Sequence, residues 1–317
     1  MIKLLLVGKL PPPIGGVTIH LQRLYSKLLE EDGIAPTIFT EEVSFNNFKK
    51  LFAIDVIHIH LNNPYKRLVF IIISSLLRKK SIITFHRDFD RNTGLKKKLD
   101  ELAVCLVDLP LMLNEESKVK AKQLNNKTNL ISSFLKPVDE EPLSPEIQRI
   151  VKSAKKFNTC FATNAHHYRM DKNQKEIYGI IELVKLFKTI PKVSLIVSDP
   201  SGEYKNRIDE KDFNNPDNIF FISSPHSFYN ILKDVDGFIR NTTTDGDSLS
   251  IHEALDLDKV VLATSVVSRP KGVQTYELHN TDKLKRLILG KNSRDSSKGN
   301  KDNFKTYLKL LNNLYES

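Results

Sequence analysis

The sequence predicts an α/β protein made of two doubly wound domains facing a cleft. Short apolar runs of strand length alternate with segments of helical periodicity, which is typical of a parallel sheet covered by helices. The alternation breaks at residues 136–145, where three prolines and three acids stand together. We interpret this segment as a linker, and we expect domains over residues 1–145 and 146–290, followed by a polar segment and a helix over 291–317.

The first domain begins with a strand, a loop and a helix. Residues 2–7 form an apolar run, residues 8–16 are rich in glycine and proline, and Val17, Leu21 and Leu24 then recur at helical spacing. The same alternation predicts strands over 55–61, 81–85 and 109–113, a buried helix over 69–77 and a further helix over 96–108.

After the linker the alternation resumes. It predicts strands over 158–163, 193–197, 219–222, 237–240 and 259–264, and helices over 177–188 and 248–257. The polar residues 292–300 then precede a last helix, marked by apolar side chains between Phe304 and Leu314.

The composition describes a globular protein with a basic surface. Of 317 residues, 40% are hydrophobic and 27% are charged, and the net charge is +10 with a pI of about 9.3. The longest apolar run, residues 68–77, is shorter than the roughly 20 residues that span a bilayer, and the N-terminus lacks the apolar core of a signal peptide. Cys105 and Cys160 form no disulfide or metal-ligand pattern. We expect a cytoplasmic protein.

Basic clusters in the first domain admit two interpretations. The clusters are Lys49-Lys50, Lys66-Arg67, Arg78-Lys79-Lys80 and Lys96-Lys97-Lys98. They either hold the domain on an anionic membrane, at the inner face of the cell membrane, or are scattered solvated side chains. Nucleic acid is not an expected partner, because the chain has no Trp and no recognisable motif for nucleic-acid recognition.

The most informative segment pairs two acids, Asp245 and Glu253, with seven residues between them. Asp245 lies in a loop before the predicted helix 248–257, and Glu253 lies about two turns into that helix. Ligands of parallel α/β sheets bind beyond the carboxyl ends of strands, where Glu253 can accept ribose hydroxyls and the helix N-terminus can take phosphates. The alternatives are a structural N-cap acid and the Asp-x-Asp of metal-dependent transferases, formed by Asp245 and Asp247.

Polar residues of the first domain gather at predicted strand ends. His60 lies near the C-terminal end of one strand, His86 lies at the end of the next, and Arg87 adds positive charge. Gly15 and Gly16 either let the backbone approach a ligand or form only a turn. His20 falls on the apolar side of its helix, so a core histidine is the alternative there. A metal site with His58, His60 and His86 competes with these roles, but we expect none, because no acid is placed to help.

In the second domain, basic residues suit a diphosphate. Arg169 and Lys175 stand between a strand and a helix, where the alternative is a solvated loop. Arg240 ends the strand 237–240, and a charge at that place needs a partner or a function.

Taken in order, these residues resemble glycosyltransferase family 4. The resemblance rests on Gly15-Gly16, His20, His60, Thr84-Phe85-His86, and Asp245 to Glu253 followed by residues 259–265. It covers nearly the whole chain and implies a retaining, nucleotide-sugar-dependent transferase with two Rossmann-like domains, the GT-B fold. It further implies transfer to a hydroxyl of a glycan or lipid-linked glycan in cell-surface polysaccharide synthesis, such as capsule or O-antigen, with no cofactor and no obligatory metal.

The resemblance also implies roles by position. His86 would contact the donor sugar, Asp245 would lie by the sugar hydroxyls and Glu253 would hold the ribose, which makes these three the catalytic set. The donor-binding set is Gly15, Gly16, Asn164, Arg169, Lys175, Arg240, Ser248, Leu249 and Glu253. The acceptor side is His20, His60 and Arg87, and the C-terminal helix would pack back onto the first domain.

Three features depart from the family pattern. Asp245 is one methylene shorter than the usual Glu, and residues 268–272 replace the usual Gly-Gly loop. Tyr178-Gly179 stands where Lys-Gly is usual, which leaves Arg169 and Lys175 as candidate substitutes. Two other functions stay open: a nucleic-acid-binding protein, and a nucleotide-sugar-binding protein without catalysis.

Overall fold

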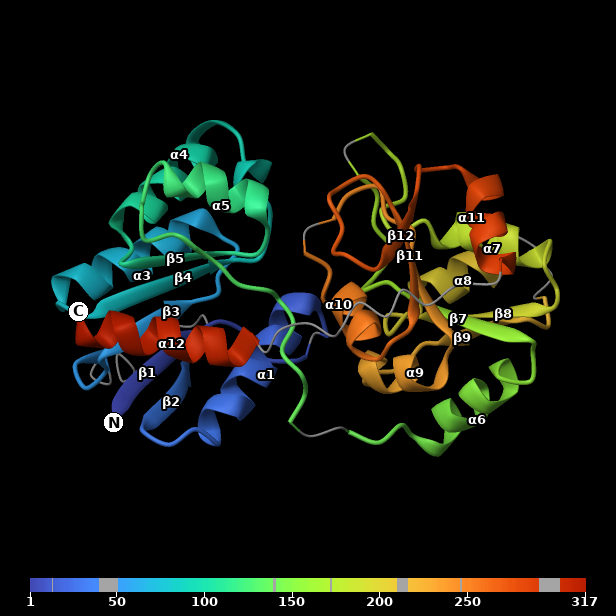
Figure 1. Cartoon of the computed structure of the whole chain (residues 1–317), viewed down its shortest axis with the longest axis horizontal. Coiled ribbons are helices and arrows are strands. Elements are labelled where there is room, and N and C mark those ends of the chain that lie inside the picture. Colours follow the sequence, from blue (N-terminus) through green and yellow to red (C-terminus); the bar gives the residue numbers. More distant parts are fainter. Residues whose placement is uncertain are drawn as a thin grey trace. The chain divides into compact units, whose positions relative to one another are not determined.

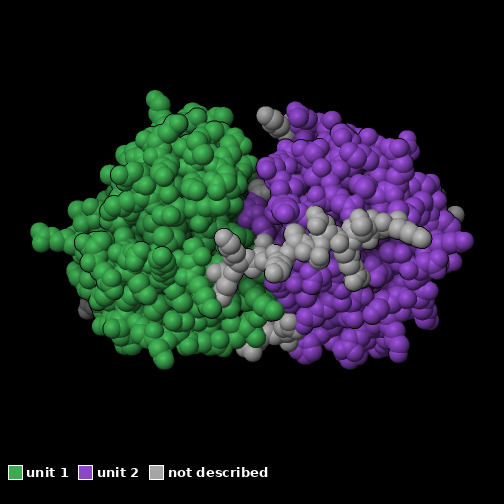
Figure 2. Space-filling model, in the orientation of Figure 1, with its two compact units in different colours: residues 1–138, 301–317 green, residues 139–300 purple. Residues whose placement is uncertain are grey.

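Two six-stranded parallel sheets form the scaffold of the protein (Figure 1). The computed structural model describes residues 1–12, 14–39, 51–138, 141–171, 173–209, 216–245, 247–290 and 303–317. The chain divides into unit 1, residues 1–138 with 301–317, and unit 2, residues 139–300 (Figure 2). The predicted α/β class with two doubly wound sheets is confirmed.

The sheet of unit 1 has the order β2-β1-β3-β4-β5-β6, and all its neighbouring strands are parallel. Its strands are β1 (Ile2–Val7), β2 (Ile34–Phe39), β3 (Val56–Ile59), β4 (Lys80–Phe85), β5 (Leu109–Met112) and β6 (Asn129–Leu130). Its helices are α1 (Gly16–Leu29), α3 (Pro64–Leu76), the short η1 (Phe89–Arg91), α4 (Gly94–Leu106), α5 (Glu115–Lys122) and α12 (Asn303–Glu316). The strand order reverses between β1 and β3, which is where such sheets bind ligands.

The sheet of unit 2 has the order β12-β11-β10-β7-β8-β9, again with parallel neighbours. Its strands are β7 (Thr159–Asn164), β8 (Val193–Ser198), β9 (Ile219–Ile222), β10 (Gly237–Arg240), β11 (Val260–Thr264) and β12 (Val273–Tyr276). Its helices are α6 (Pro145–Ala154), α7 (Ile180–Lys188), α8 (Glu203–Asp209), α9 (Phe228–Asp234), α10 (Leu249–Asp256) and α11 (Thr281–Leu289). Counted from β7, this is the strand order of dinucleotide-binding sheets, with its reversal between β7 and β10.

Each sheet is buried on both faces because its side chains alternate between two cores. In unit 1, Leu5 of β1 belongs to a core with α3 and α4, whereas Leu4 belongs to a core with α1 and α12. Tyr307 and Leu311 of α12 are fully buried in this second core. The C-terminal helix is therefore part of unit 1.

Helix α3 differs from the buried helix that the sequence predicts over 69–77. It begins earlier, at Pro64, because Asn63 caps it by accepting hydrogen bonds from two backbone amides of the first turn. Val69, Ile72 and Leu76 are exposed. Apolar residues stand on all sides of this helix, so their periodicity does not reveal that one side is open.

Arg67, which the sequence analysis placed in a basic cluster with Lys66, is buried. Its guanidinium pairs with the Asp100 carboxylate, donates to the Leu61 carbonyl at 2.8 and 3.2 Å, and lies 4.1 Å from the centre of the Phe85 ring. Burial lowers the pKa of Arg67 to about 10 and raises the pKa of Asp100. Arg67 thus ties α3 to α4 and is unavailable to a membrane surface.

The expected linker ends in a helix. Pro145 is the first residue of α6, and Ser144 caps that helix by accepting a hydrogen bond from the Ile147 amide. Strand β2 was not predicted; it is an edge strand that contains Pro36. Proline is tolerated at such an edge but weakens the strand signal.

Some expectations fall outside the described residues. These are Lys49, Lys50, Gly246, part of the expected linker at 139–140, and the polar segment 291–302. Within the described ranges, no helix has the length and apolar character needed to cross a bilayer.

Replacing Asp100 by Ala should lower the free energy of unfolding of unit 1 by about 3–5 kcal/mol, because Arg67 would stay buried without its carboxylate. The control is Glu116→Ala, which removes an exposed ion pair with Lys120 and should leave the stability nearly unchanged. Denaturant unfolding followed by circular dichroism measures both variants. Equal, small effects would contradict this account of the buried pair.

Candidate functional site

In unit 2 the strand order reverses between β7 and β10, and each of these two strands ends in a polar residue. Asn164 ends β7 and Arg240 ends β10, and the two strands are neighbours. Arg240 Nη1 donates to Asn164 Oδ1 at 3.3 Å. Asn164 Nδ2 in turn donates to Ser250 Oγ at 2.8 Å, which ties both strand ends to the first turn of α10.

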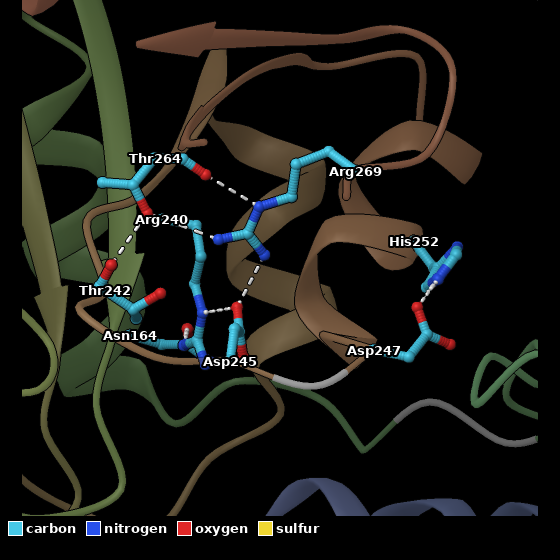
Figure 3. A network of polar contacts seen from close by, with 8 residues as sticks. All are labelled: Asn164, Arg240, Thr242, Asp245, Asp247, His252, Thr264 and Arg269. Carbon is cyan, nitrogen blue, oxygen red and sulfur yellow. Dashed lines mark hydrogen bonds and ion pairs between the residues drawn. The ribbon is translucent and has the colours of Figure 1, made fainter. Parts of the chain in front are cut away.

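Asp245 lies between two arginines (Figure 3). Its carboxylate accepts from Arg240 Nε and Nη2, both at 3.0 Å, and from Arg269 Nη1 at 2.8 Å. The three side chains are 7%, 14% and 3% exposed, respectively. Burial alone would raise the pKa of Asp245, but the two guanidinium groups outweigh it and hold that pKa below its ordinary value. Asp245 is therefore an ionised group that positions two cations.

Arg269 was not among the predicted site residues. Its Nε donates to the Thr264 carbonyl at 2.9 Å, and Thr264 Oγ1 donates to the Thr242 carbonyl at 2.8 Å, so the guanidinium is fixed from the end of β11 (Figure 3). In the sequence, residues 268–272 stand out only as a replacement of the usual glycine loop. An arginine in the loop after a strand was the available signal, and it is weaker than that of Arg240, which ends its strand.

The start of α10 lies beside this network. Ser248 is its N-cap residue, without a side-chain capping bond, and Leu249 is its first residue. Both are nearly buried, and Glu253, in the second turn, is 3% exposed. A helix N-terminus carries partial positive charge and attracts anions. The predicted ribose-binding acid is thus a buried carboxylate near a positively charged helix end.

Asp247 does not join Asp245 in a metal site. Its carboxylate pairs with His252 Nε2, one turn into α10, while Asp245 faces the arginines (Figure 3). The geometry gives each acid its own partner, which does not support the Asp-x-Asp alternative.

Arg169 and Lys175 occupy a separate loop. Both are exposed, and the loop is closed by the Asp171 carboxylate, which accepts from the Lys175 amide at 2.9 Å. Among the described residues, no hydrogen bond or ion pair joins either side chain to the network of Asp245. Instead Tyr178, at the departure from the family pattern, lies with its ring 5.4 Å from the Arg240 guanidinium.

Gly179 is required by its neighbours. Its φ is +59°, and a Cβ there would lie 2.4 Å from the Asn241 side chain and carbonyl. Asn241 Nδ2 donates to the Gly179 carbonyl at 3.0 Å, so this glycine lets the start of α7 close on the chain that follows β10.

In unit 1 the predicted histidines meet. The ring of His20, on α1, lies 5.6 Å from that of His60 and 5.1 Å from that of His86. His60 Nδ1 and His86 Nε2 are hydrogen bonded at 3.0 Å, and His20 Nδ1 donates to the Ser133 carbonyl at 2.8 Å. His20 and His60 are buried, which agrees with the core alternative for His20. Arg87, the residue after His86, is exposed.

The ring of His58 lies 4.0 Å from that of His60. It is buried, with Nε2 bonded to Thr84 Oγ1 at 2.8 Å and Nδ1 to Tyr307 Oη at 3.0 Å. Burial lowers the pKa of His58, His60 and His86 well below the ordinary value, and neighbouring histidines lower it further. The three rings are neutral at physiological pH. Both nitrogens of His58 are already bonded within the protein, so His60 and His86, rather than His58, are the rings that can hydrogen bond to a ligand without carrying charge.

The glycines of the first loop differ in what surrounds them. A Cβ at Gly16 would meet no atom within 4 Å, and one at Gly15 would meet only Thr18 Oγ1 at 3.9 Å, so the chain's own packing leaves space at both. Gly8 is constrained instead, because a Cβ there would lie 2.8 Å from the Leu21 side chain. Gly8 therefore allows α1 to pack closely against the end of β1.

Metal-ligand spacing occurs once among the described residues. One ring nitrogen from each of His20, His60 and His86 lies within 4.8 Å of the others. Three imidazoles suit ions such as Zn²⁺, whereas Mg²⁺ and Mn²⁺ prefer oxygen ligands. This cluster is therefore unlike the carboxylate sites of metal-dependent transferases.

Comparison with known proteins adds a relative and a fold. No family model matches the chain. A curated relative, an uncharacterized glycosyltransferase of Methanocaldococcus jannaschii, is 23% identical over 177 residues, which cover 54% of this chain and 42% of that protein. The matched part therefore spans less than half of the relative's length.

Solved structures with the same fold bind or act on UDP compounds. Anabaena HepE in complex with UDP aligns with a TM-score of 0.66 and 15% identity, over 91% of this chain and 89% of that one. A putative UDP-N-acetylglucosamine 2-epimerase from Listeria monocytogenes aligns with a TM-score of 0.67 and 12% identity, over 99% and 97%. The resemblance to GT-B glycosyltransferases is confirmed at the level of the fold, while family 4 membership and a retaining reaction stay predictions.

The histidine cluster should make the protein less stable in acid. In the unfolded chain these rings take up a proton near pH 6.5, whereas in the folded protein they stay neutral, so protons favour the unfolded state. Stability should fall as the pH drops below about 6.5, by up to about 1.4 kcal/mol per pH unit for each neutral ring.

Thermal unfolding in EDTA, between about pH 7.5 and about pH 5.5, measures this dependence. His58→Gln should make it shallower, and His279→Gln, an exposed histidine of unit 2, is the control for a substitution outside the cluster. A melting temperature that does not fall over this range would show that the rings are already protonated in the folded protein.

Proposed function

We propose that the chain is a glycosyltransferase that transfers a sugar from a UDP-sugar to a hydroxyl of a glycan or lipid-linked glycan. The observation that carries the proposal is the buried group of Arg240, Asp245 and Arg269 at the reversal point of unit 2. Two guanidinium groups and one carboxylate leave one net positive charge in a place shielded from water. That charge would attract a diphosphate, because guanidinium groups bind phosphate oxygens strongly.

The rest of the donor fits around this group. The start of α10, with Ser248 and Leu249, would take phosphate oxygens, and Glu253 would accept the ribose hydroxyls. Asn164 is already oriented by Arg240 and Ser250 and would complete the polar wall. The choice of uridine is supported by the UDP and UDP-glucose complexes of Anabaena HepE, a fold relative.

Catalysis would depend on the leaving diphosphate. Its bond to the anomeric carbon breaks as the acceptor hydroxyl forms the new glycosidic bond, and the hydroxyl proton passes to an oxygen of the departing diphosphate. Negative charge grows on the diphosphate while positive charge grows on the sugar. Preorganised cations lower the energy of such a transition state. Arg240 and Arg269 supply them without a metal ion, so we propose that transfer needs no added metal or other cofactor.

Unit 1 would contribute the acceptor side. His86 would contact the donor sugar, and His20, His60 and Arg87 would face the acceptor, as the resemblance implies. Neutral imidazoles hydrogen bond to sugar hydroxyls without competing for the charge of the diphosphate. Retention of the anomeric configuration is part of the proposal and is supported by the resemblance to family 4.

The proposed setting is cell-surface polysaccharide synthesis, such as that of capsule or O-antigen, at the inner face of the cell membrane. A net charge of +10 supports contact with anionic lipid. A glycan or lipid-linked glycan acceptor would be met at that surface.

UDP binding should separate two roles for Asp245. If Asp245 positions the arginines, Asp245→Asn should weaken UDP binding about tenfold or more, although it removes a negative charge near the diphosphate. If Asp245 only repels the diphosphate, the same variant should bind more tightly. Glu253→Gln should also weaken binding, and Glu277→Gln, an exposed acid of unit 2, is the matched control.

Isothermal titration with UDP, preceded by a thermal-shift panel of UDP-, GDP-, dTDP- and ADP-sugars, measures these effects. No response to any nucleotide, together with strongly salt-dependent binding to DNA or RNA, would favour the nucleic-acid alternative.

Turnover should depend on His86 and not on metal. With the preferred donor and a glycan acceptor, His86→Ala should lower the rate by about 100-fold with the fold intact, and EDTA should leave the wild-type rate unchanged. His166→Ala, an exposed histidine of unit 2, is the control. Product analysis by mass spectrometry distinguishes transfer from epimerisation of the donor. Loss of activity in EDTA and recovery with Mn²⁺ would overturn the proposal that transfer needs no metal. Donor binding without turnover would favour the alternative of a nucleotide-sugar-binding protein without catalysis.

A further inference from the structure

Two helices of unit 1, α3 and α4, are neighbours (Figure 1). Each carries several exposed apolar side chains. The residues are Tyr65, Val69, Ile72 and Leu76 on α3, and Leu95, Leu102 and Leu106 on α4, each between 44% and 78% exposed. Spacings of three, four and seven place each set along one side of its helix. We call this surface the α3/α4 face.

The α3/α4 face is not needed for the core. The inner sides of the two helices already supply Phe70 and Ile71 from α3 and Ala103 and Val104 from α4. An exposed apolar residue standing alone is ordinary on a protein surface, but seven on two adjacent helices form a patch of the kind that marks an interaction site.

The charges around the patch indicate an anionic partner. Lys66, Lys96 and Lys98 are exposed on the same two helices. The acids of α4 are already paired: Asp100 is buried against Arg67, and Glu101 lies 3.9 Å from Lys97, which also pairs with Asp90 at 3.1 Å. Helix α3 contains no acid, and Arg78 follows its C-cap residue Leu77. Apolar stripes flanked by lysine are typical of helices that lie in a lipid interface.

We infer that the α3/α4 face docks unit 1 on an anionic lipid surface. Each helix has 13 residues, about 20 Å in length, which is too short to span a bilayer core of about 30 Å, so both would lie flat. The apolar side chains would enter the boundary between headgroups and acyl chains, and the lysines would meet lipid phosphates. The inference deepens the membrane setting of the proposed function and assigns it to particular residues.

Flotation of the full chain with lipid vesicles tests the inference. The vesicles contain phosphatidylcholine alone or mixed with phosphatidylglycerol, and no sugar nucleotide is present, so failure here would leave donor binding untouched. The apolar variant is Val69→Ser/Leu76→Ser/Leu102→Ser, and the charge variant is Lys66→Gln/Lys96→Gln/Lys98→Gln. Their controls lie on α1 and α12, on the opposite face of the sheet: Leu29→Ser, and Lys305→Gln/Lys309→Gln.

The wild-type chain should bind the anionic vesicles and bind neutral vesicles far more weakly. The charge variant should bind anionic vesicles about fivefold more weakly for each lysine removed and depend less on salt. The apolar variant should bind more than tenfold more weakly, and the controls should match the wild type. Unchanged thermal unfolding shows that the variants fold.

Two results would overturn the inference. One is no binding to anionic vesicles, or binding that the controls reduce as much as the face variants do. The other is a chain that self-associates in sedimentation without binding vesicles and becomes monomeric in the apolar variant, which would make the α3/α4 face an interface between two copies.

Discussion

The carboxylate of Asp245 holds the candidate donor site together. A buried ion must be paired, and here one anion serves two cations, one at the end of β10 and one in the loop after β11. Through Arg240 the network reaches Asn164 at the end of β7, and through Arg269 it reaches Thr264 at the end of β11. The network around Asp245 thus links the ends of three strands to the start of α10. The reversal of strand order supplies the place, and the ion pairs supply the positive charge.

The candidate site residues of the two units differ in charge. Unit 2 presents fixed charge, which suits an anionic ligand. Unit 1 presents imidazoles that burial keeps neutral, arranged in layers: His58 bonds to Thr84 and Tyr307, and above it His60 bonds to His86. Neutral groups of this kind select for hydroxyls by hydrogen bonding and add little to charge recognition. This division agrees with a nucleotide on one unit and sugar hydroxyls on the other.

The sequence predicted what depends on local pattern. Alternating strands and helices gave the two sheets, and the strand ends identified His60, His86 and Arg240. The partners of the ions were not predictable in the same way, because Arg269 stands 24 residues after Asp245 and no periodicity connects them. The assignment of Asp245 to sugar hydroxyls came from resemblance alone, and the arginines that now surround it were not visible. The open side of α3 was also hidden, because a helix apolar on every side has no pattern to distinguish a buried side from an exposed one.

Helix α12 has a consequence for how the protein is made. Tyr307 bonds to His58, and Leu311 fills the core beneath β1, yet both follow unit 2 in the chain. During synthesis, residues 139–300 must leave the ribosome before unit 1 receives its last helix. By then all strands of unit 2 have been synthesised, so unit 2 can fold first. The apolar side chains of α1 and β1 that pack against α12 stay partly exposed until α12 is made. The nascent first unit is therefore the part of this protein that most needs protection from aggregation.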